Sequence, residues 1–141
     1  MSNAPKKVRI VFPPSGRANI ADWTVSVVLA ITHEFVGLSW KEPVDADAGL
    51  VIFITSMVGG SQLDLDPIRV AERWGHTIFV VTGDEGTVSP AELGKITGEG
   101  RIWFFHTKMP VAQDGFLPFT DLRSAIQHVL LGLPLDDLGK E

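Results

Sequence analysis

Glycines and small polar residues follow the most apolar run of this 141-residue sequence, and their types and spacing suit ligand binding. The run extends from Leu50 to Ile54. Glycine lets the backbone approach a ligand closely, and hydroxyl groups and free amides near a helix start favour an anion. The sequence therefore predicts a phosphate- or carboxylate-binding loop directly after this run. The residues concerned are Thr55, Ser56, Gly59, Gly60 and Ser61.

A second polar loop follows the first apolar run, Val8 to Phe12, and contains Ser15, Gly16 and Arg17. If both runs are parallel strands, their carboxyl ends meet at one edge of the sheet. Arg17 is then placed to pair with a bound anion. The alternative is that both loops only turn the chain. Asp64 and Asp66 favour this alternative because their carboxylates would repel an anion.

His106 and Glu85 are the candidates for acid–base catalysis. His106 follows an aromatic run, and an imidazole exchanges its proton near neutral pH. The alternatives are a polar strand end for His106 and a solvated turn for Glu85. The sequence therefore leaves open whether the protein is an enzyme. The four histidines lack metal-ligand spacing, so we predict neither a metal site nor a cofactor.

Apolar runs that alternate with helical patterns place these loops in an α/β protein. The runs lack polar alternation, which is typical of parallel strands buried on both faces. We predict a three-layer, flavodoxin-like fold: a five-stranded parallel sheet in the order 2-1-3-4-5, with helices on both faces and a ligand crevice between strands one and three. The expected strands are residues 8–12, 38–40, 50–54, 76–81 and 101–105.

The first predicted helix, Ile20 to Val36, is apolar around most of its circumference. Gly37 is expected to end it in the left-handed conformation. The helix either packs between the sheet and a neighbour or forms a homodimer interface. The following link, Lys41 to Ala48, is too short for a full crossover helix.

Capping signals predict three later helices. Asp66 is expected to cap the second with Pro67 in its first turn, Ser89 begins a capping box for a helix through Ile96, and Thr120 caps the last. The segment from His106 to Pro118 is predicted to be a loop. The four tryptophans are spread along the chain, and we assign them to the core.

Composition indicates one domain, residues 8–134, between loose tails at 1–7 and 135–141. The net charge of −5 and the lack of a basic stripe argue against nucleic-acid binding. No apolar stretch is long enough for a membrane span, and the N-terminus does not read as a secretory signal. With no cysteine, these features favour a cytoplasmic protein.

The central stretch resembles the sugar-isomerase (SIS) domain of phosphosugar-binding proteins, which ends a strand with Ser-x-Ser-Gly-x-Thr. The corresponding residues here are 56–61, and the resemblance extends over residues 49–92 through Ala71, Gly75, Thr82 and Ser89. It implies a phosphosugar binder or an isomerase-like domain. The residues implicated in sugar-phosphate binding are Ser56, Gly59 and Ser61.

The opening stretch, residues 9–23, resembles the start of a bacterial Toll/interleukin-receptor (TIR) domain, with Ser15 to Arg17 in its first loop and Trp23 in its first helix. Pro67 stands where that family has its NAD-cleaving Glu. This second resemblance implies a signalling or assembly domain that acts through protein contacts, without NAD hydrolysis.

Overall fold

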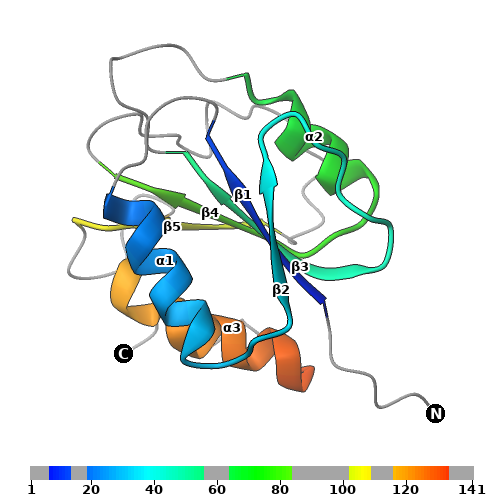
Figure 1. Cartoon of the computed structure of the whole chain (residues 1–141). Coiled ribbons are helices and arrows are strands. Elements are labelled where there is room, and N and C mark those ends of the chain that lie inside the picture. The colour runs from blue at the N-terminus through cyan, green and yellow to red at the C-terminus, as the bar shows by residue number, and fades with distance from the viewer. Residues whose placement is uncertain (1–6, 14–18, 56–63, 84–101, 109–115, 134–141) are drawn as a thin grey trace.

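Strands and helices alternate along most of the chain, as the apolar runs predict. The computed structural model describes residues 7–13, 19–55, 64–83, 102–108 and 116–133 (Figure 1). The elements in chain order are β1 (Lys7–Phe12), α1 (Asn19–Leu29), β2 (Phe35–Ser39), β3 (Ala48–Ile54), α2 (Asp66–Arg73), β4 (Ile78–Thr82), β5 (Ile102–His106), β6 (Phe116–Pro118), a 3-10 turn (Phe119–Asp121) and α3 (Leu122–Leu131).

The strands form one six-stranded sheet in the order β2-β1-β3-β4-β5-β6, and every neighbouring pair is parallel. This confirms the predicted α/β fold and the order 2-1-3-4-5. The central strand β4 is buried along its whole length, and β3 is buried except at Gly49. Strands covered on both faces need apolar side chains on both, which is why their sequences show no polar alternation.

β6 adds a sixth strand within the segment from His106 to Pro118 that is predicted to be a loop. Phe116 is buried and packs edge-on against Phe104, with 6.1 Å between ring centroids. Pro118 is paired with His106 at the edge of the sheet, where a residue without an N–H is tolerated. A three-residue strand that contains proline carries too little periodicity to be recognised in a sequence.

Two apolar layers hold the helices to the sheet. α1 and α3 cover one face and α2 covers the other (Figure 1). Alternate side chains of a strand enter the two layers: Ile10 packs on the α1 and α3 side, and Val11 packs on the α2 side. None of the described helices is long and apolar enough to cross a membrane.

α1 ends at Leu29, so the predicted helix from Ile20 to Val36 is too long. Phe35 and Val36 belong to β2, where they are paired with β1. Gly37 lies inside this strand and does not end a helix. The apolar spacing typical of a helix continues past Leu29. Phe35 and Val36 nevertheless form a strand, because their pairing with β1 outweighs this local helical pattern. By contrast, Gly132 follows α3 with φ of 73°, as its place in the sequence indicates.

The helix caps differ from those predicted. Asp66 is the first residue of α2, and the carboxylate of Asp64 accepts a hydrogen bond from its backbone N–H at 3.0 Å. Pro67 lies in the first turn, as predicted. Thr120 lies in the 3-10 turn before α3, so it is not the cap. The predicted helix of residues 89–96 lies outside the described residues, as do both predicted tails except for Lys7.

Two of the four tryptophans are exposed, which corrects their assignment to the core. Trp40 is buried, but Trp23 is 49% and Trp74 is 69% exposed. α2 buries Ile68, Ala71 and Glu72, whose spacing defines its inner face. Trp74 follows the last turn and lies off that face, and Val70 is also exposed.

Candidate functional site

The carboxyl edge of the sheet contains a topological switch point. The chain passes from β1 to β2 on one side and continues with β3 on the other. Val11 of β1 is paired with Phe53 of β3, so these two strands end next to each other. Open α/β sheets bind ligands where the strand order reverses in this way. The strand order therefore has its switch point between strands one and three, where the sequence predicts the ligand crevice.

Most predicted binding residues lie outside the described part of the chain. This holds for both polar loops and for one of the two catalytic candidates. Thr55 and His106 are the predicted site residues whose surroundings the structure describes. The residues outside it are Ser15, Gly16, Arg17, Ser56, Gly59, Gly60, Ser61 and Glu85.

Thr55 connects the ends of two strands. Its side chain is fully buried, and its hydroxyl donates a hydrogen bond to the carbonyl oxygen of Val81 at 3.2 Å. The backbone N–H of Thr55 donates to the same oxygen at 3.0 Å. In this arrangement the hydroxyl holds the end of β3 against β4. From Thr55 the chain continues directly into the predicted binding loop.

His106 is a packed and hydrogen-bonded strand end. The residue is 7% exposed, and its ring lies edge-on to Phe116, with 5.4 Å between centroids. Its Nδ1 accepts a hydrogen bond from the backbone N–H of Lys108 at 3.0 Å. A neutral ring that accepts at Nδ1 carries its proton on Nε2. Nε2 is therefore the nitrogen through which His106 would exchange a proton or donate to a ligand.

Gly83 brings α1 against the carboxyl edge. A Cβ atom at this buried position would lie 2.5 Å from Cδ1 of Ile20 and 3.1 Å from Oγ1 of Thr107. Only glycine allows this approach without a shift of its neighbours. The contact fixes the first turn of α1 beside the ends of β4 and β5.

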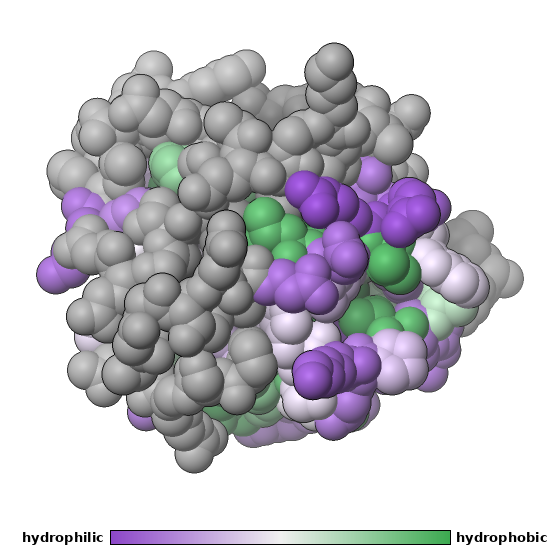
Figure 2. Space-filling model, turned by 90° about the horizontal axis from the view of Figure 1, so that it is seen from above, coloured by the Kyte–Doolittle hydropathy of each residue, from purple (hydrophilic) through white to green (hydrophobic). Residues whose placement is uncertain are grey.

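Figure 2 looks onto the molecule from above and shows apolar residues set among strongly hydrophilic ones on the described surface.

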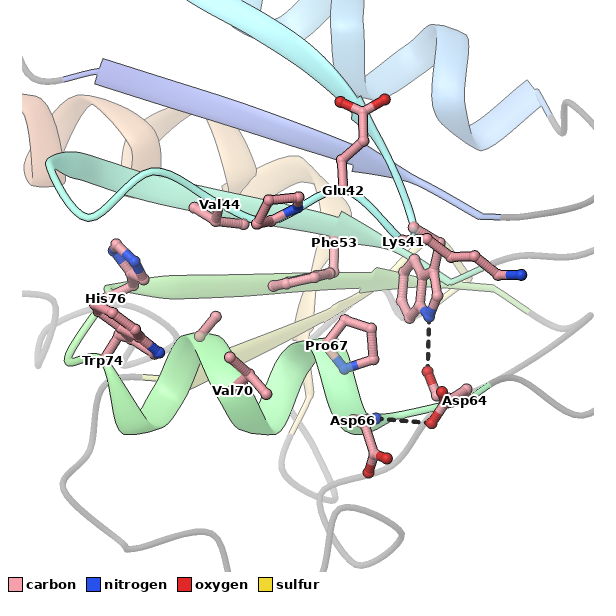
Figure 3. A pocket seen from close by; sticks show the side chains of 13 residues that line it. Lys41, Glu42, Val44, Phe53, Asp64, Asp66, Pro67, Val70, Trp74 and His76 are labelled. Carbon is pink, nitrogen blue, oxygen red and sulfur yellow. Dashed lines mark hydrogen bonds between the residues drawn. The ribbon is translucent and has the colours of Figure 1, made fainter.

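A groove of about 440 Å³ lies on the α2 side of the sheet (Figure 3). The connection between β2 and β3 crosses this side without a helix, so α2 has no helical neighbour over β1 and β3 among the described residues. Phe53 forms part of the floor, and Trp74 lies at one end. No residue pattern singled out above predicts the groove. The signal was present, because the link at residues 41–48 is too short for the helix that would fill it.

An ion pair fixes the connection that forms one wall of this groove. Arg9 of β1 donates two hydrogen bonds to Asp45, from Nε at 2.8 Å and from Nη2 at 2.6 Å. The Arg9 side chain is 11% exposed and that of Asp45 is 40% exposed. The guanidinium hydrogen bonds hold the pKa of Asp45 well below its usual range, and those same bonds raise the pKa of Arg9. A second pair, Lys7 with Asp47, lies at the surface.

Comparisons with protein-family models, curated proteins and solved structures give no match for this chain. Within the described ranges, no three His, Asp or Glu side chains gather as ligands for a metal ion.

Proposed function

We propose that this protein binds a phosphorylated or other anionic small molecule at the carboxyl edge of the sheet. The observation that carries the proposal is the switch point between β1 and β3, the place where open parallel sheets receive ligands. The chain leaves both strands there, and the residues that follow in sequence are Ser15 to Arg17 and Ser56 to Ser61. Their glycines, hydroxyls and one guanidinium are the groups that suit an anion.

The resemblance of residues 49–92 to SIS domains narrows the proposed ligand to a sugar phosphate. The backbone amides and hydroxyls would hold the phosphate, and Arg17 would pair with its charge. Nε2 of His106 would be available at the end of β5 for a proton exchange, which an isomerase requires. The proposal concerns binding of the sugar phosphate. Its turnover would be an additional step.

Calorimetric titration separates phosphate recognition from sugar recognition. We expect glucose 6-phosphate and inorganic phosphate to release saturable heat, and glucose to release none, because the charged group supplies the main contacts. Replacing Arg17 by glutamine should weaken phosphate binding by about tenfold or more, as a charge-assisted hydrogen bond is lost. Arg73→Gln is the matched control. Arg73 is the last residue of α2 and belongs to neither polar loop, so this variant should bind phosphate like the wild type. Heat from glucose equal to that from glucose 6-phosphate, or no heat from any phosphate, contradicts the proposal.

A second candidate function is assembly through α1, as the resemblance to TIR domains implies. The specific observation is that Trp23 and Leu29 of this helix are 49% and 43% exposed. Apolar side chains of this size, exposed on one helix, favour a homodimer contact.

Light scattering tests this second function. A dimer mass that Leu29→Glu converts to a monomer mass supports assembly, because a buried carboxylate would oppose the contact. The variant should melt like the wild type, since Leu29 is exposed in the single chain. A wild-type protein that stays monomeric at high concentration excludes this function. Absence of NAD turnover is expected in either case.

A further inference from the structure

β2 is the longer of the two edge strands, and its sequence has none of the features that usually protect an edge. The opposite edge strand, β6, has only three residues and ends in Pro118. β2 has five residues, with neither a proline nor a charged residue among them. An unprotected edge offers a row of N–H and C=O groups to which another chain can pair. In Figure 1, β2 lies at the front of the sheet, and no described helix crosses it.

The hydrogen bonds to β1 define which backbone groups of β2 point outward. The N–H of Val8 donates to the carbonyl oxygen of Glu34 at 3.3 Å, and Val8 is paired with Phe35. Successive residues of a strand direct their backbone groups to opposite edges, so Val36 and Leu38, like Glu34, direct theirs toward β1. The residues that direct theirs away from the sheet are Phe35, Gly37 and Ser39.

These three outward-facing residues are symmetric about Gly37, which suits a second copy of the same strand. If Gly37 lies opposite Gly37 of an antiparallel second copy, Phe35 lies opposite Ser39, and each outward-facing residue meets another. A two-fold axis then relates the copies. The carbonyl oxygen of Ser39 already accepts from the N–H of Glu42 at 3.1 Å. The new hydrogen bonds therefore form between the two glycines and from each Ser39 N–H to the carbonyl oxygen of Phe35.

The side chains on both faces of β2 are compatible with this pairing. Leu38 packs on the α2 side of the sheet, and Val36, two residues earlier, is on the same face and 49% exposed. In this register, Val36 lies opposite Leu38 of the second copy, and the contact removes apolar surface from water. On the other face, Phe12 lies close to Gly37, where a Cβ atom would be 2.8 Å from Cε2 of its ring.

We propose that two copies of this chain pair through β2 in antiparallel orientation, so that their sheets join into one. The strand carries no charge, so no like charges meet along it. The contact uses neither the loops of the proposed anion site nor the exposed side chains of α1. Because the contact is about the size of one strand pair, we expect a reversible dimer with a Kd below about 1 mM.

Amide hydrogen exchange, followed residue by residue by NMR, distinguishes this dimer from any other. In the single chain, the N–H groups of Val36 and Leu38 are bonded to β1 and exchange slowly, whereas those of Gly37 and Ser39 point outward and exchange fast. Raising the protein concentration from about 20 µM to 1 mM should slow exchange at Gly37 and Ser39 by about twofold or more. Exchange at Val36 should change little.

Light scattering on two variants of Ser39 tests the same contact. Ser39→Pro removes the outward-facing N–H, and an edge strand tolerates proline at such a position. We expect this variant to raise the Kd of the dimer at least about tenfold, because two hydrogen bonds across the axis are lost. Ser39→Ala retains the N–H and should dimerise like the wild type.

A charge at Val36 tests the apolar part of the contact. Val36→Lys should also raise the Kd at least about tenfold, because its ammonium group would lie against Leu38 of the second copy. Val70→Lys is the matched control, since Val70 is 43% exposed on α2, away from β2. Ser39 and Val36 are both exposed in the single chain, so unchanged circular dichroism spectra should show that the variants fold.

Three results would overturn the proposal. The first is a wild-type protein that stays monomeric at about 1 mM. The second is a dimer that Ser39→Pro and Val36→Lys leave intact, for example one that only Leu29→Glu dissociates. The third is protection of the Gly37 amide that does not depend on protein concentration, because another part of the same chain would then cover β2. None of these results bears on the phosphate titration, so the two proposals fail separately.

Discussion

Replacing Phe79 by alanine is expected to lower the free energy of unfolding by about 3–5 kcal/mol. Phe79 lies in the middle of β4 and is fully buried. Its ring packs against Trp103 and Phe105, with 6.2 and 5.0 Å between centroids. Truncation leaves a cavity beside rings that the neighbouring strand β5 holds in place, so they cannot collapse into it. Urea unfolding followed by circular dichroism measures the loss.

The matched control for Phe79 is Trp74, an even larger aromatic residue that is 69% exposed. Trp74→Ala should change the free energy of unfolding by only about 0.5 kcal/mol, because little of the ring is buried in the single chain. A loss of similar size in both variants would show that α2 buries Trp74. A loss below about 1 kcal/mol for Phe79→Ala would contradict the central position of β4.

Asp45→Asn is expected to cost about 1–2 kcal/mol at neutral pH, a discounted value because Asp45 is partly exposed and water screens its charge. The substitution leaves the guanidinium of Arg9, which is 11% exposed, without its charged partner. Asp47→Asn is the matched control from the same connection. Asp47 and Lys7 are both more than half exposed, so this change should cost only about 0–1 kcal/mol.

The cost of Asp45→Asn should depend on pH in a defined direction. Hydrogen bonds from Arg9 depress the pKa of Asp45 in the folded protein. A depressed carboxyl pKa contributes stability that is fully present above the unfolded value, about 3.9, and that is lost as the pH falls from there through the folded value. The difference between wild type and variant should therefore be constant from pH 7 to 5 and shrink below about pH 4. A difference that stays constant to pH 2, or one equal to that of Asp47→Asn at every pH, contradicts the ion pair's role.

The sequence predicts the central architecture well because burial on both faces leaves a strong local pattern. Leu50 to Ile54 and Ile78 to Val81 are continuous apolar runs, and both are central strands. Gly75 and Gly132 mark helix ends and have positive φ, 83° and 73°. These features depend on the properties of single residues or short runs, so they can be recognised without tertiary contacts.

Features that depend on tertiary pairing were predicted wrongly. Phe35 continues the apolar spacing of α1, yet it belongs to β2, where it pairs with Val8 of β1 at the edge of the sheet. β6 becomes a strand only through its pairing with β5. Trp74 has a large apolar side chain of the kind that is often buried in a core. It is exposed here only because of where the end of α2 lies in three dimensions.

In the candidate site too, some features follow from local sequence and others depend on tertiary contacts. The sequence predicts the switch point between strands one and three correctly, because strand order follows from the run pattern and the handedness of crossovers. Thr55 stays a predicted binding residue, and the structure adds that its hydroxyl donates a hydrogen bond to the carbonyl oxygen of Val81, a contact between strands that local sequence does not specify. The groove beside α2 follows from the short link at residues 41–48, whose consequence becomes visible only when β2 and β3 are placed on either side of β1.

The most direct test of the proposed anion site is a titration of the labelled protein with glucose 6-phosphate, followed through backbone amide resonances. We expect the amides of Thr55, Gly83 and Thr107, at the carboxyl ends of β3, β4 and β5, to shift together and saturate, while the indole resonance of Trp74 stays in place. Amides that do not move up to about 10 mM ligand, or shifts centred on α2 and the groove, would contradict the account.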